Sequence, residues 1–399
     1  MNIVVVNICG ALNSGDHTQL VALLKVINEA YPQARVTCVH RNPELHAEIL
    51  PQFQWVESLG TSHSMGRIAR RLGNMERLLP AFLRLPGLLP PAQKATYTAL
   101  RGADLVVACA GGYLGDPGPH VYTALLHLTL SRHGRLFVFP QSIGPMHSLL
   151  AKHLTAKVLR RAKFLLVREP CTYDYVTQEM GFDREKVRLF PDMAFYERDV
   201  DADGAQAVLQ KLGLRADERI AATTLWPSSR LGVPESRYFQ ILGAAARTLL
   251  KDHGIRTVVL RQAGDAEGIE GDTHLLHQAA PYFGDAAVMA YDYHAPAVLR
   301  GIVRTSQVTY GTRMHGNVFS LAQCVPTVAI SYNHKTEGIM QMCGQGRFII
   351  KLQELQLPFL LDRLQEALQD QVAIRLSLRE YVAGFQQRRE ELVELLRRC

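Results

Sequence analysis

The sequence predicts an α/β protein made of two Rossmann-like, doubly wound halves that face a central cleft. Short apolar runs alternate with amphipathic helical stretches, which is typical of parallel strands joined by helical crossovers. The alternation restarts after a polar segment at 197–214, and 399 residues are enough for two buried cores. We therefore expect domains at 1–197 and 198–375, with a terminal helix at 376–399 packed across both.

In the first half, the apolar runs predict strands and one long helix. Leu20, Leu23, Leu24 and Ile27 follow helical spacing and place a helix at 16–31. The predicted strands are 3–7, 36–40, 104–110, 136–139, 164–167 and 187–190. Parallel strands in this order create ligand sites at their carboxyl ends.

The second half repeats this organisation. The predicted strands are 220–225, 256–260, 306–309, 327–331 and a short one at 347–350. The predicted helices are 236–252, 295–304 and 317–323. Two such halves would bring facing strand ends to one cleft.

Composition excludes several classes of protein. Apolar residues make up 47% and charged residues 20% of the chain, as in ordinary globular proteins. The formal charge of +7 suits anionic substrates or an anionic membrane surface and does not imply a nucleic-acid partner. The 7 cysteines contain no Cys-x-x-Cys pair, so we expect neither a disulfide framework nor a zinc site.

Cysteine usage also favours a reducing, cytoplasmic compartment. We expect no signal peptide, because 2–8 is typical of a buried strand. We expect no membrane span either, because no stretch approaches the roughly 20 apolar residues that one needs. Oligomeric state is not predicted.

The segment 60–91 differs from its surroundings, because it predicts a basic amphipathic helix followed by a Pro-rich loop. Its arginines are Arg67, Arg70, Arg71, Arg77 and Arg84. One interpretation is a surface helix whose arginines reach into solvent. The other is peripheral contact with the inner face of a membrane or with a lipid diphosphate.

The most informative stretch runs from Thr309 to Asn317. A strand ends there, and a turn then delivers Arg313 and His315 at the start of a helix. Lys335 arrives at the corresponding end of the next strand. These three cations predict a site for a small, multiply charged anion, in which the imidazole readily exchanges a proton near neutral pH.

The loop containing Asn13, Gly15 and Asp16 follows a strand and opens a helix. Glycine lets the backbone approach a ligand, and amides at a helix N-terminus attract anions. The loop has neither the dinucleotide-binding nor the Walker spacing. A tight turn capped by Asp16 is an equally open interpretation.

Small and polar residues end two further strands of the first half. Gly111 and Gly112 would open space at the floor of the cleft, and Gln141 and Ser142 lie in a loop at the same edge. Asp116 would either hydrogen-bond a hydroxyl, act as a base, or serve as the turn residue before a proline.

Arg168 comes directly after the predicted strand 164–167, where a guanidinium would point into the cleft and clamp a carboxylate or phosphate. Asp192 follows the last predicted strand of this half. It would either fix one of these cations or cap a turn.

Together and in this order, these loops resemble the polysaccharide pyruvyl transferase family. The matching pieces are 13–16, 111–112, 141–145, 167–169, 192–195 and 312–315, with Tyr332 and Lys335. The resemblance covers about 2–347, and the Arg-x-His segment with Pro326 and Lys335 is its most specific part. His17 and Tyr113 depart from the pattern, and both departures would alter the acceptor fit.

The resemblance implies a glycosyltransferase-B-like (GT-B-like) fold with the acceptor on the first domain and the donor on the second. It implies transfer of a pyruvyl group from phosphoenolpyruvate to two hydroxyls of a sugar in a cell-surface polysaccharide or its precursor. The products are a cyclic ketal and phosphate. Phosphoenolpyruvate is a co-substrate, no other cofactor is expected, and the acceptor is either free, nucleotide-linked or lipid-linked. We expect no metal, because the sequence offers no carboxylate cluster suited to one; recruitment of magnesium by a lone Asp together with the substrate phosphate stays open.

The same resemblance assigns roles to individual residues. Arg168, Arg313 and Lys335 would hold the donor's negative groups. His315 would give a proton to the methylene carbon or to the departing phosphate. The remaining loop residues, Tyr332 among them, would contact substrate.

Two other functions stay open. A nucleotide-sugar glycosyltransferase of the same shape would need an acidic residue for the donor ribose, for which Glu337 is a weak candidate. A non-catalytic scaffold on the same fold is disfavoured by the intact set of Arg313, His315 and Lys335.

Overall fold

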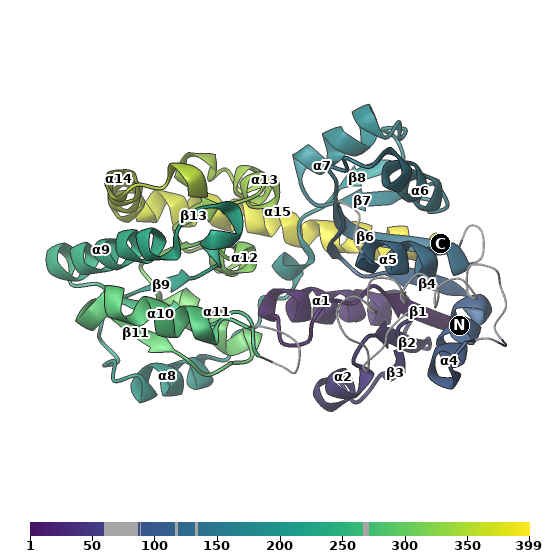
Figure 1. The fold of residues 1–399 in the computed structure, drawn as a ribbon, viewed down its shortest axis with the longest axis horizontal. Helices are drawn as coiled ribbons and strands as arrows, with labels where there is room; N and C mark the ends of the chain where they lie inside the picture. Colours follow the sequence, from purple (N-terminus) through teal and green to yellow (C-terminus); the bar gives the residue numbers. More distant parts are fainter. Residues whose placement is uncertain (60–86, 88, 116–118, 132–134, 266–270) are drawn as a thin grey trace. The chain divides into compact units, whose positions relative to one another are not determined.

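The computed structural model describes the whole chain except residues 60–86, 88, 116–118, 132–134 and 266–270 (Figure 1). Contacts divide the chain into two compact α/β units. The first consists of Met1–Ala11, Gln19–Met193 and Arg388–Cys399, and the second of Leu12–Thr18 and Ala194–Gln387. Helices α1 (Ser14–Ala30) and α15 (Gln371–Arg397) each supply residues to both units.

The described part of the first unit contains an eight-stranded sheet in the order β3-β2-β1-β4-β6-β7-β8, with β5 paired to β6. Every strand pair in it is parallel. The strands are β1 (Asn2–Val6), β2 (Arg35–His40), β3 (Gln54–Glu57), β4 (Leu105–Ala108), β5 (Gly111–Leu114), β6 (Leu136–Ile143), β7 (Leu165–Val167) and β8 (Val187–Leu189). The strand order reverses between β1 and β4, so the loops after these two strands diverge.

Two helices of the first unit, α2 (Pro43–Ile49) and α6 (Leu149–Leu159), begin at a side-chain cap. The side chain of Asn42 accepts a hydrogen bond from the Leu45 amide at 3.3 Å, and Ser148 accepts one from the Ala151 amide at 3.3 Å. The unit also contains α4 (Pro91–Gly102), α5 (Pro119–Leu130) and α7 (Pro170–Asp174), which a π-helical turn (Tyr175–Glu179) extends.

The second unit contains, within its described residues, a six-stranded parallel sheet in the order β11-β10-β9-β12-β13-β14. Its strands are β9 (Ile220–Thr224), β10 (Arg256–Leu260), β11 (Ala287–Ala290), β12 (Val308–Gly311), β13 (Thr327–Ser331) and β14 (Ile349–Lys351). The strand order reverses between β9 and β12. Loops that leave these two strands therefore diverge at the carboxyl edge, where ligands bind in open α/β sheets.

Helices of the second unit fall into two groups by their mutual contacts. Helix α9 contacts α10 and α14, whereas α11 contacts α8 and α12, and α12 contacts α13. Right-handed crossovers on either side of the reversal point place such groups on opposite faces of the sheet. The helices are α8 (Ala202–Lys211), α9 (Glu235–His253), α10 (Thr273–Phe283), α11 (Pro296–Thr305), α12 (Met314–Ala322), α13 (His334–Met342) and α14 (Leu357–Gln369). Short 3₁₀ turns lie at Met193–Tyr196, Ser228–Leu231, Gly284–Ala286, Gly346–Phe348 and Leu352–Glu354.

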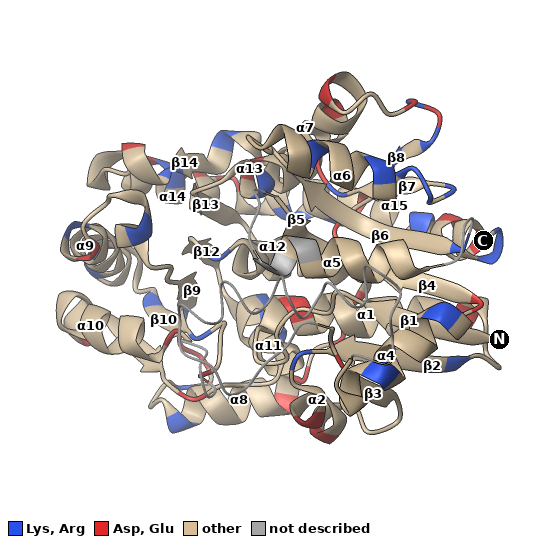
Figure 2. Ribbon diagram, turned by 45° about the vertical axis from the view of Figure 1, so that its right-hand side comes forward, with Lys and Arg blue, Asp and Glu red and all other residues tan. Residues whose placement is uncertain are grey.

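Each sheet is buried on both faces by its helices. Strands β9, β12 and β13 contain no charged residue and are tan along their length in Figure 2. The core of the second unit includes Tyr238, Tyr310 and Phe319, all fully buried. Such near-continuous apolar strands are what a covered parallel sheet requires.

The two-unit α/β fold confirms the predicted fold class, and the structure adds elements that the sequence pattern missed. Strands β3, β5 and β11 were not predicted. The polar segment expected at 197–214 contains α8, because Asp201 caps that helix by accepting the Gly204 amide at 2.8 Å. Helix α12 begins at Met314, three residues before the predicted start at 317.

The helix predicted within 60–91 falls almost entirely on residues outside the described part of the chain. Among the described residues, no helix combines the length and the apolar character needed to span a membrane.

Candidate functional site

The turn that carries Arg313 and His315 lies at the reversal point of the second sheet. Strand β12 ends at Gly311, which pairs with Thr224 at the end of β9. A Cβ atom at Gly316 would lie 2.9 Å from the side chain of Thr224, so glycine is needed for this close approach. The hydroxyl of Thr224 in turn accepts the Arg313 amide at 3.3 Å. The turn is thus fixed to β9.

The Arg313 side chain is held on two sides. Its Nε donates to the Leu225 carbonyl oxygen at 3.2 Å, and its Nη2 forms an ion pair with Asp272. Arg313 has no other side-chain hydrogen-bond partner among the residues that the structure describes, so both N–H groups on Nη1 are left for a ligand. The guanidinium is therefore oriented in advance and keeps unused donors.

Asp272 was missed by sequence reasoning. It lies at the N-cap position of α10, yet its Oδ2 accepts the amides of Gln262 and Ala263, both at 3.0 Å. Its Oδ1 accepts Arg313, and only 1% of the side chain is exposed. The sequence analysis predicted no helix after Asp272, and an Asp at the start of a helix would suggest only a cap, so no sequence signal pointed to the ion pair.

His315 lies in the first turn of α12, where it is half-buried. A Cβ atom at Gly15 would overlap its imidazole ring. The backbone at the start of α1 therefore lies directly against His315. The sequence predicted both segments as parts of a site and gave no indication that they touch.

Hydrogen bonds fix the start of α1 to the second unit. The amide and hydroxyl of Ser14 both donate to the Gln262 carbonyl oxygen, at 3.0 and 2.9 Å. The buried Arg300 donates from Nη1 to the Thr18 hydroxyl at 3.2 Å. Leu12–Thr18 thus belongs to this unit by its contacts, although its neighbours in sequence belong to the first.

The first turn of α1 is capped by Asn13. Its Oδ1 accepts the amides of Gly15 and Asp16 at 3.1 and 3.3 Å. The helix begins at Ser14, two residues earlier than predicted, and the cap is Asn13 where the sequence suggested Asp16. The Gly15 and Asp16 amides therefore already donate to Asn13. The contact between this loop and His315 is a van der Waals contact made by the Cα side of Gly15.

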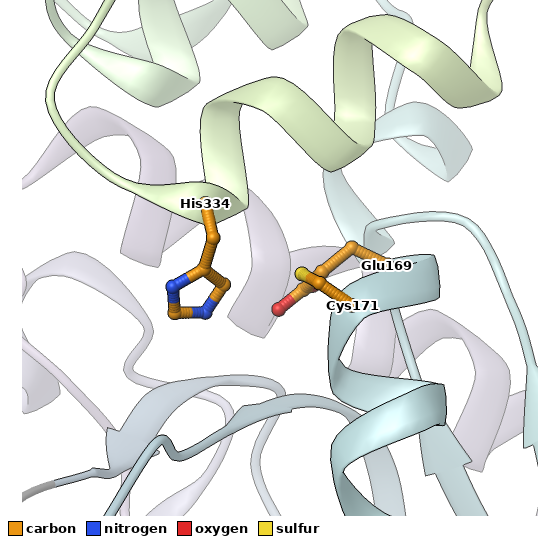
Figure 3. A group of neighbouring side chains, drawn as sticks. All are labelled: Glu169, Cys171 and His334. Carbon is orange, nitrogen blue, oxygen red and sulfur yellow. The ribbon is translucent and has the colours of Figure 1, made fainter.

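Tyr332 and Lys335 follow β13, the strand next to β12. Asn333 caps the helix that begins here, accepting the amides of Lys335 and Thr336 at 3.1 and 3.2 Å. His334 is the first residue of this helix and is drawn in Figure 3. Tyr332 and Lys335 are both half-buried at the carboxyl edge.

Tyr332 stacks on Trp226, which follows β9. The two ring centroids are 4.1 Å apart and the ring planes are inclined by 17°. Sequence reasoning did not single out Trp226. Its position two residues after a buried strand could have identified Trp226 as a candidate site residue.

A buried tyrosine joins the two loops at the reversal point. The Tyr238 hydroxyl lies 2.6 Å from the hydroxyl of Thr312 and has a backbone hydrogen bond with Trp226. Burial raises the pKa of Tyr238 well above its usual value, so the hydroxyl stays protonated. Tyr238 therefore fixes the spacing between the Trp226 loop and the Arg313 turn.

The glycine pair predicted in the first unit lies on β5. Gly111 pairs with Gln141 of β6, and the Gln141 amide nitrogen donates to the Cys109 carbonyl oxygen and, at 3.1 Å, to the Tyr113 hydroxyl. Among the described residues the Gln141 Oε1 is buried without a hydrogen-bond partner. Gly112 is half-buried beside Gly111. Asp116, predicted at the same edge, lies outside the described residues.

Arg168 is enclosed within the first unit, with 2% of its side chain exposed. Its Nη1 pairs with Asp192 at 2.7 Å, and its Nε donates to the Ser142 hydroxyl at 2.7 Å. Glu169, which follows Arg168, and Cys171 stand at the start of α7 (Figure 3). Asp192 fixes a cation, one of the two roles predicted for it. Donor binding by Arg168 stays a prediction.

Comparison with known proteins identifies a family that this chain matches. The model of the polysaccharide pyruvyl transferase family matches residues 13–334. The match begins at Asn13, includes Arg313 and His315, and ends one residue before Lys335. The amylovoran biosynthesis protein AmsJ of Erwinia amylovora is 24% identical over 369 residues, which cover 87% of this chain and 86% of AmsJ.

Solved structures with the same fold include sugar-nucleotide enzymes. UDP-GlcNAc 2-epimerase from Neisseria meningitidis, bound to UDP-GlcNAc, aligns with a TM-score of 0.62 at 10% identity and 99% coverage of both chains. Anabaena HepE in complex with UDP-glucose aligns with a TM-score of 0.60 at 14% identity, again with 99% coverage of both. At such identity the likeness shows the fold alone. The family match over most of the chain shows more: this protein belongs to the polysaccharide pyruvyl transferase family and is an enzyme of that kind.

Proposed function

We propose that this enzyme transfers the pyruvyl group of phosphoenolpyruvate to two hydroxyls of one sugar of a polysaccharide or its precursor. The observation that carries the proposal is the guanidinium of Arg313. This guanidinium lies two residues before His315 and is fixed by Asp272 and Leu225, and no described residue accepts a hydrogen bond from its Nη1. A donor with a carboxylate and a phosphate needs such oriented cationic donors. Lys335, at the end of the neighbouring strand, would add a second positive charge.

The chemistry proceeds through protonation of the donor's methylene carbon. The alkene electron pair takes the proton, and the adjacent carbon becomes electrophilic. A sugar hydroxyl attacks that carbon and loses its proton, forming the first C–O bond. Phosphate then leaves with the electron pair of its C–O bond. The second hydroxyl attacks the same carbon and loses its proton, which closes the ketal.

His315 is the acid of this scheme, either for the methylene carbon or for the departing phosphate. An imidazole, unlike a guanidinium or an ammonium group, is suited to proton transfer near neutral pH, and general acid catalysis contributes about 100- to 10,000-fold. Gly15 and the start of α1 restrict where the ring can lie. Cationic groups oriented before the reaction stabilise the developing charge without reorganisation.

The first unit supplies the remaining proposed site residues. Arg168 would add to donor binding, with Asp192 and Ser142 holding its guanidinium. Gly111, Gly112 and Gln141 would contact the acceptor, for which the buried Oε1 of Gln141 offers an acceptor of hydrogen bonds. Phosphoenolpyruvate is the co-substrate, and the scheme requires no metal.

Phosphate release tests the proposal directly. The purified enzyme, phosphoenolpyruvate and a panel of saccharide acceptors should release phosphate in an acceptor-dependent manner. Mass spectrometry of the acceptor should show the increment of one pyruvate ketal. Release of phosphate without any acceptor product, or no release with every acceptor of the panel, would contradict the proposal.

Nucleotide-sugar glycosyl transfer is the second candidate, suggested by Glu337 in the first turn of α13 and by the UDP-sugars in the fold relatives. In this protein the Glu337 carboxylate accepts the Ser331 hydroxyl at 3.1 Å, which occupies one of its oxygens. Thermal shift separates the two candidates. Stabilisation by phosphoenolpyruvate and none by UDP-sugars supports pyruvyl transfer.

A further inference from the structure

Trp226 is an aromatic side chain that the hydrophobic core does not explain, and it stacks on Tyr332, which packs against that core. Both rings are half-buried, and they stack on each other at 4.1 Å. Within the described residues, Trp226 belongs neither to the buried core of the second unit nor to the half-buried side chains packed on it. A large aromatic side chain held in an ordered stack outside the core marks a contact surface for a ligand.

The pair is placed beside the predicted anion site. Trp226 comes directly after Leu225, whose carbonyl oxygen accepts the Nε of Arg313 at 3.2 Å. Tyr332 precedes Lys335 by three residues at the end of the adjacent strand. The two rings therefore come from loops on either side of β12, the strand that leads into Arg313.

The ligand of this aromatic surface follows from its position beside Arg313. The inference rests on the proposed function, in which Arg313 binds the donor. If Arg313 holds the donor, two acceptor hydroxyls must reach the same donor carbon, so the ring that carries them lies next to Arg313. A pyranose presents an apolar C–H face and hydroxyls at its edge. The face of an aromatic ring carries partial negative charge and attracts the polarised C–H groups.

Tyr332 covers one face of the Trp226 indole and itself packs on the core, so the opposite face of Trp226 is the one that can meet a ligand. We propose that this face of Trp226, supported by Tyr332, is the platform on which the pyranose ring of the acceptor stacks. In this role Trp226 contributes to acceptor binding and leaves the affinity for the donor unchanged. Tyr238 sets the position of the platform, because its hydroxyl is bonded to the Trp226 backbone and to Thr312.

The chain offers a direct probe, because it contains only two tryptophans. Trp55 lies in the first unit, where its indole nitrogen donates to the Leu50 carbonyl oxygen at 3.0 Å. In a Trp55→Phe background, tryptophan fluorescence reports Trp226 alone. This variant is titrated with methyl hexopyranosides in the presence of saturating phosphoenolpyruvate, and in parallel with uridine diphosphate. Calorimetry measures phosphoenolpyruvate binding separately.

We expect a methyl hexopyranoside to change the Trp226 signal and uridine diphosphate to leave it unchanged. Trp226→Leu should raise the acceptor KM about tenfold, the equivalent of about 1.4 kcal/mol, with donor affinity unchanged. Trp226→Tyr should restore most of the loss, because it retains an aromatic face. A merely structural role would move donor affinity and acceptor KM together.

Three outcomes overturn this inference. The first is a Trp226 signal that no hexopyranoside changes, together with an unaltered acceptor KM in Trp226→Leu. The second is a signal that responds to uridine diphosphate instead, which would assign the platform to a nucleobase. The third is an equal loss of donor and acceptor affinity in Trp226→Leu. Failure of the wild-type protein to bind phosphoenolpyruvate would be a different result, because it contradicts the proposed function itself.

Discussion

Arg313 and Asp272 form an ion pair in which the carboxylate is more deeply buried than the guanidinium. The side chain of Asp272 is 1% exposed and that of Arg313 is 21% exposed. Asp272 also accepts the amides of Gln262 and Ala263, which compensates the loss of its hydration. Its charge therefore holds the guanidinium of Arg313 in one orientation.

Replacing Asp272 by Asn should disorder Arg313. The side-chain oxygen of the introduced Asn would still accept hydrogen bonds from the amides of Gln262 and Ala263. Its NH₂ group would then face the guanidinium of Arg313, and two donors cannot form a hydrogen bond. Charge-assisted hydrogen bonds contribute about 1.5–3 kcal/mol, so we expect phosphoenolpyruvate binding to weaken by about tenfold or more in calorimetry.

Asp292→Asn provides the matched control for this variant. Asp292 pairs with Lys211 in the same unit, the two side chains are 62% and 73% exposed, and exposed pairs contribute little. Donor affinity in this control should remain that of the parent. Tighter donor binding in Asp272→Asn would mean that neutralisation of Arg313, and not its orientation, is the main effect of the pair.

Replacement of His315 by Ala should abolish most turnover and retain donor binding. The variant loses the proposed acid and leaves Arg313 in place, so kcat should fall about 100- to 10,000-fold. Calorimetric donor affinity should change little. His277→Ala, an exposed histidine stacked on Tyr291, is the control and should turn over normally. A His315→Ala variant with the same kcat as the parent enzyme would show that His315 is not the acid.

Gly15→Ala should reduce turnover by displacing the imidazole of His315. Alanine favours a helix by about 0.8–1 kcal/mol over glycine, so the substitution would not weaken α1 by propensity. The added methyl overlaps the ring, however, and one of the two must shift. We expect kcat to fall while the melting temperature changes by no more than a few degrees.

Gly10→Ala is the matched comparison, because a Cβ atom there meets nothing within 4 Å. Steady-state kinetics of the two variants should differ, with Gly10→Ala close to the parent. Equal activities would show that the contact between Gly15 and His315 has no bearing on turnover.

The sequence predicted the parts of this protein that local patterns encode. Apolar runs in alternation with helical spacing predicted both sheets, since buried parallel strands leave that pattern. The strand–turn–helix at 309–317 likewise predicted that Arg313 and His315 stand at a carboxyl edge. Strands β5 and β11 were missed because they are four residues long and carry a weak pattern.

Contacts between distant segments could not be predicted in the same way. Asp272 meets Arg313, Trp226 meets Tyr332 and Gly15 meets His315, each across a separation that no periodicity spans. Arg168 shows the same limit, because a strand-end arginine has one sequence pattern whether it faces solvent or is enclosed by Asp192 and Ser142. Whether such an arginine faces solvent or is enclosed depends on its burial, and burial is set by the complete fold.

A buried histidine in the first unit should make stability depend on pH. Burial lowers the pKa of His127 to about 4, from an ordinary value of 6.5. Its Nδ1 lies 3.0 Å from the Asn7 side-chain oxygen, and its Nε2 accepts the Leu59 amide at 3.3 Å. A neutral ring that donates from Nδ1 and accepts at Nε2 satisfies both contacts, and protonation would remove the second.

The sign of the effect follows from proton binding. Between pH 6.5 and 4 the unfolded chain binds a proton at His127 that the folded chain does not, so stability falls as pH falls through this window. The slope is at most about 1.4 kcal/mol per pH unit, and the full contribution is present above pH 6.5. Burial also lowers the pKa of His40 to about 3, which adds to the slope in the same direction.

Urea unfolding of Trp226→Phe, followed by Trp55 fluorescence, isolates this effect in the first unit. His127→Gln in that background cannot titrate and should lose part of the pH dependence below 6.5, although its stability at neutral pH should be lower. Because His40 is unchanged, the slope should become shallower and should not vanish. A slope identical to that of the parent would show that His127 does not remain neutral in the folded protein.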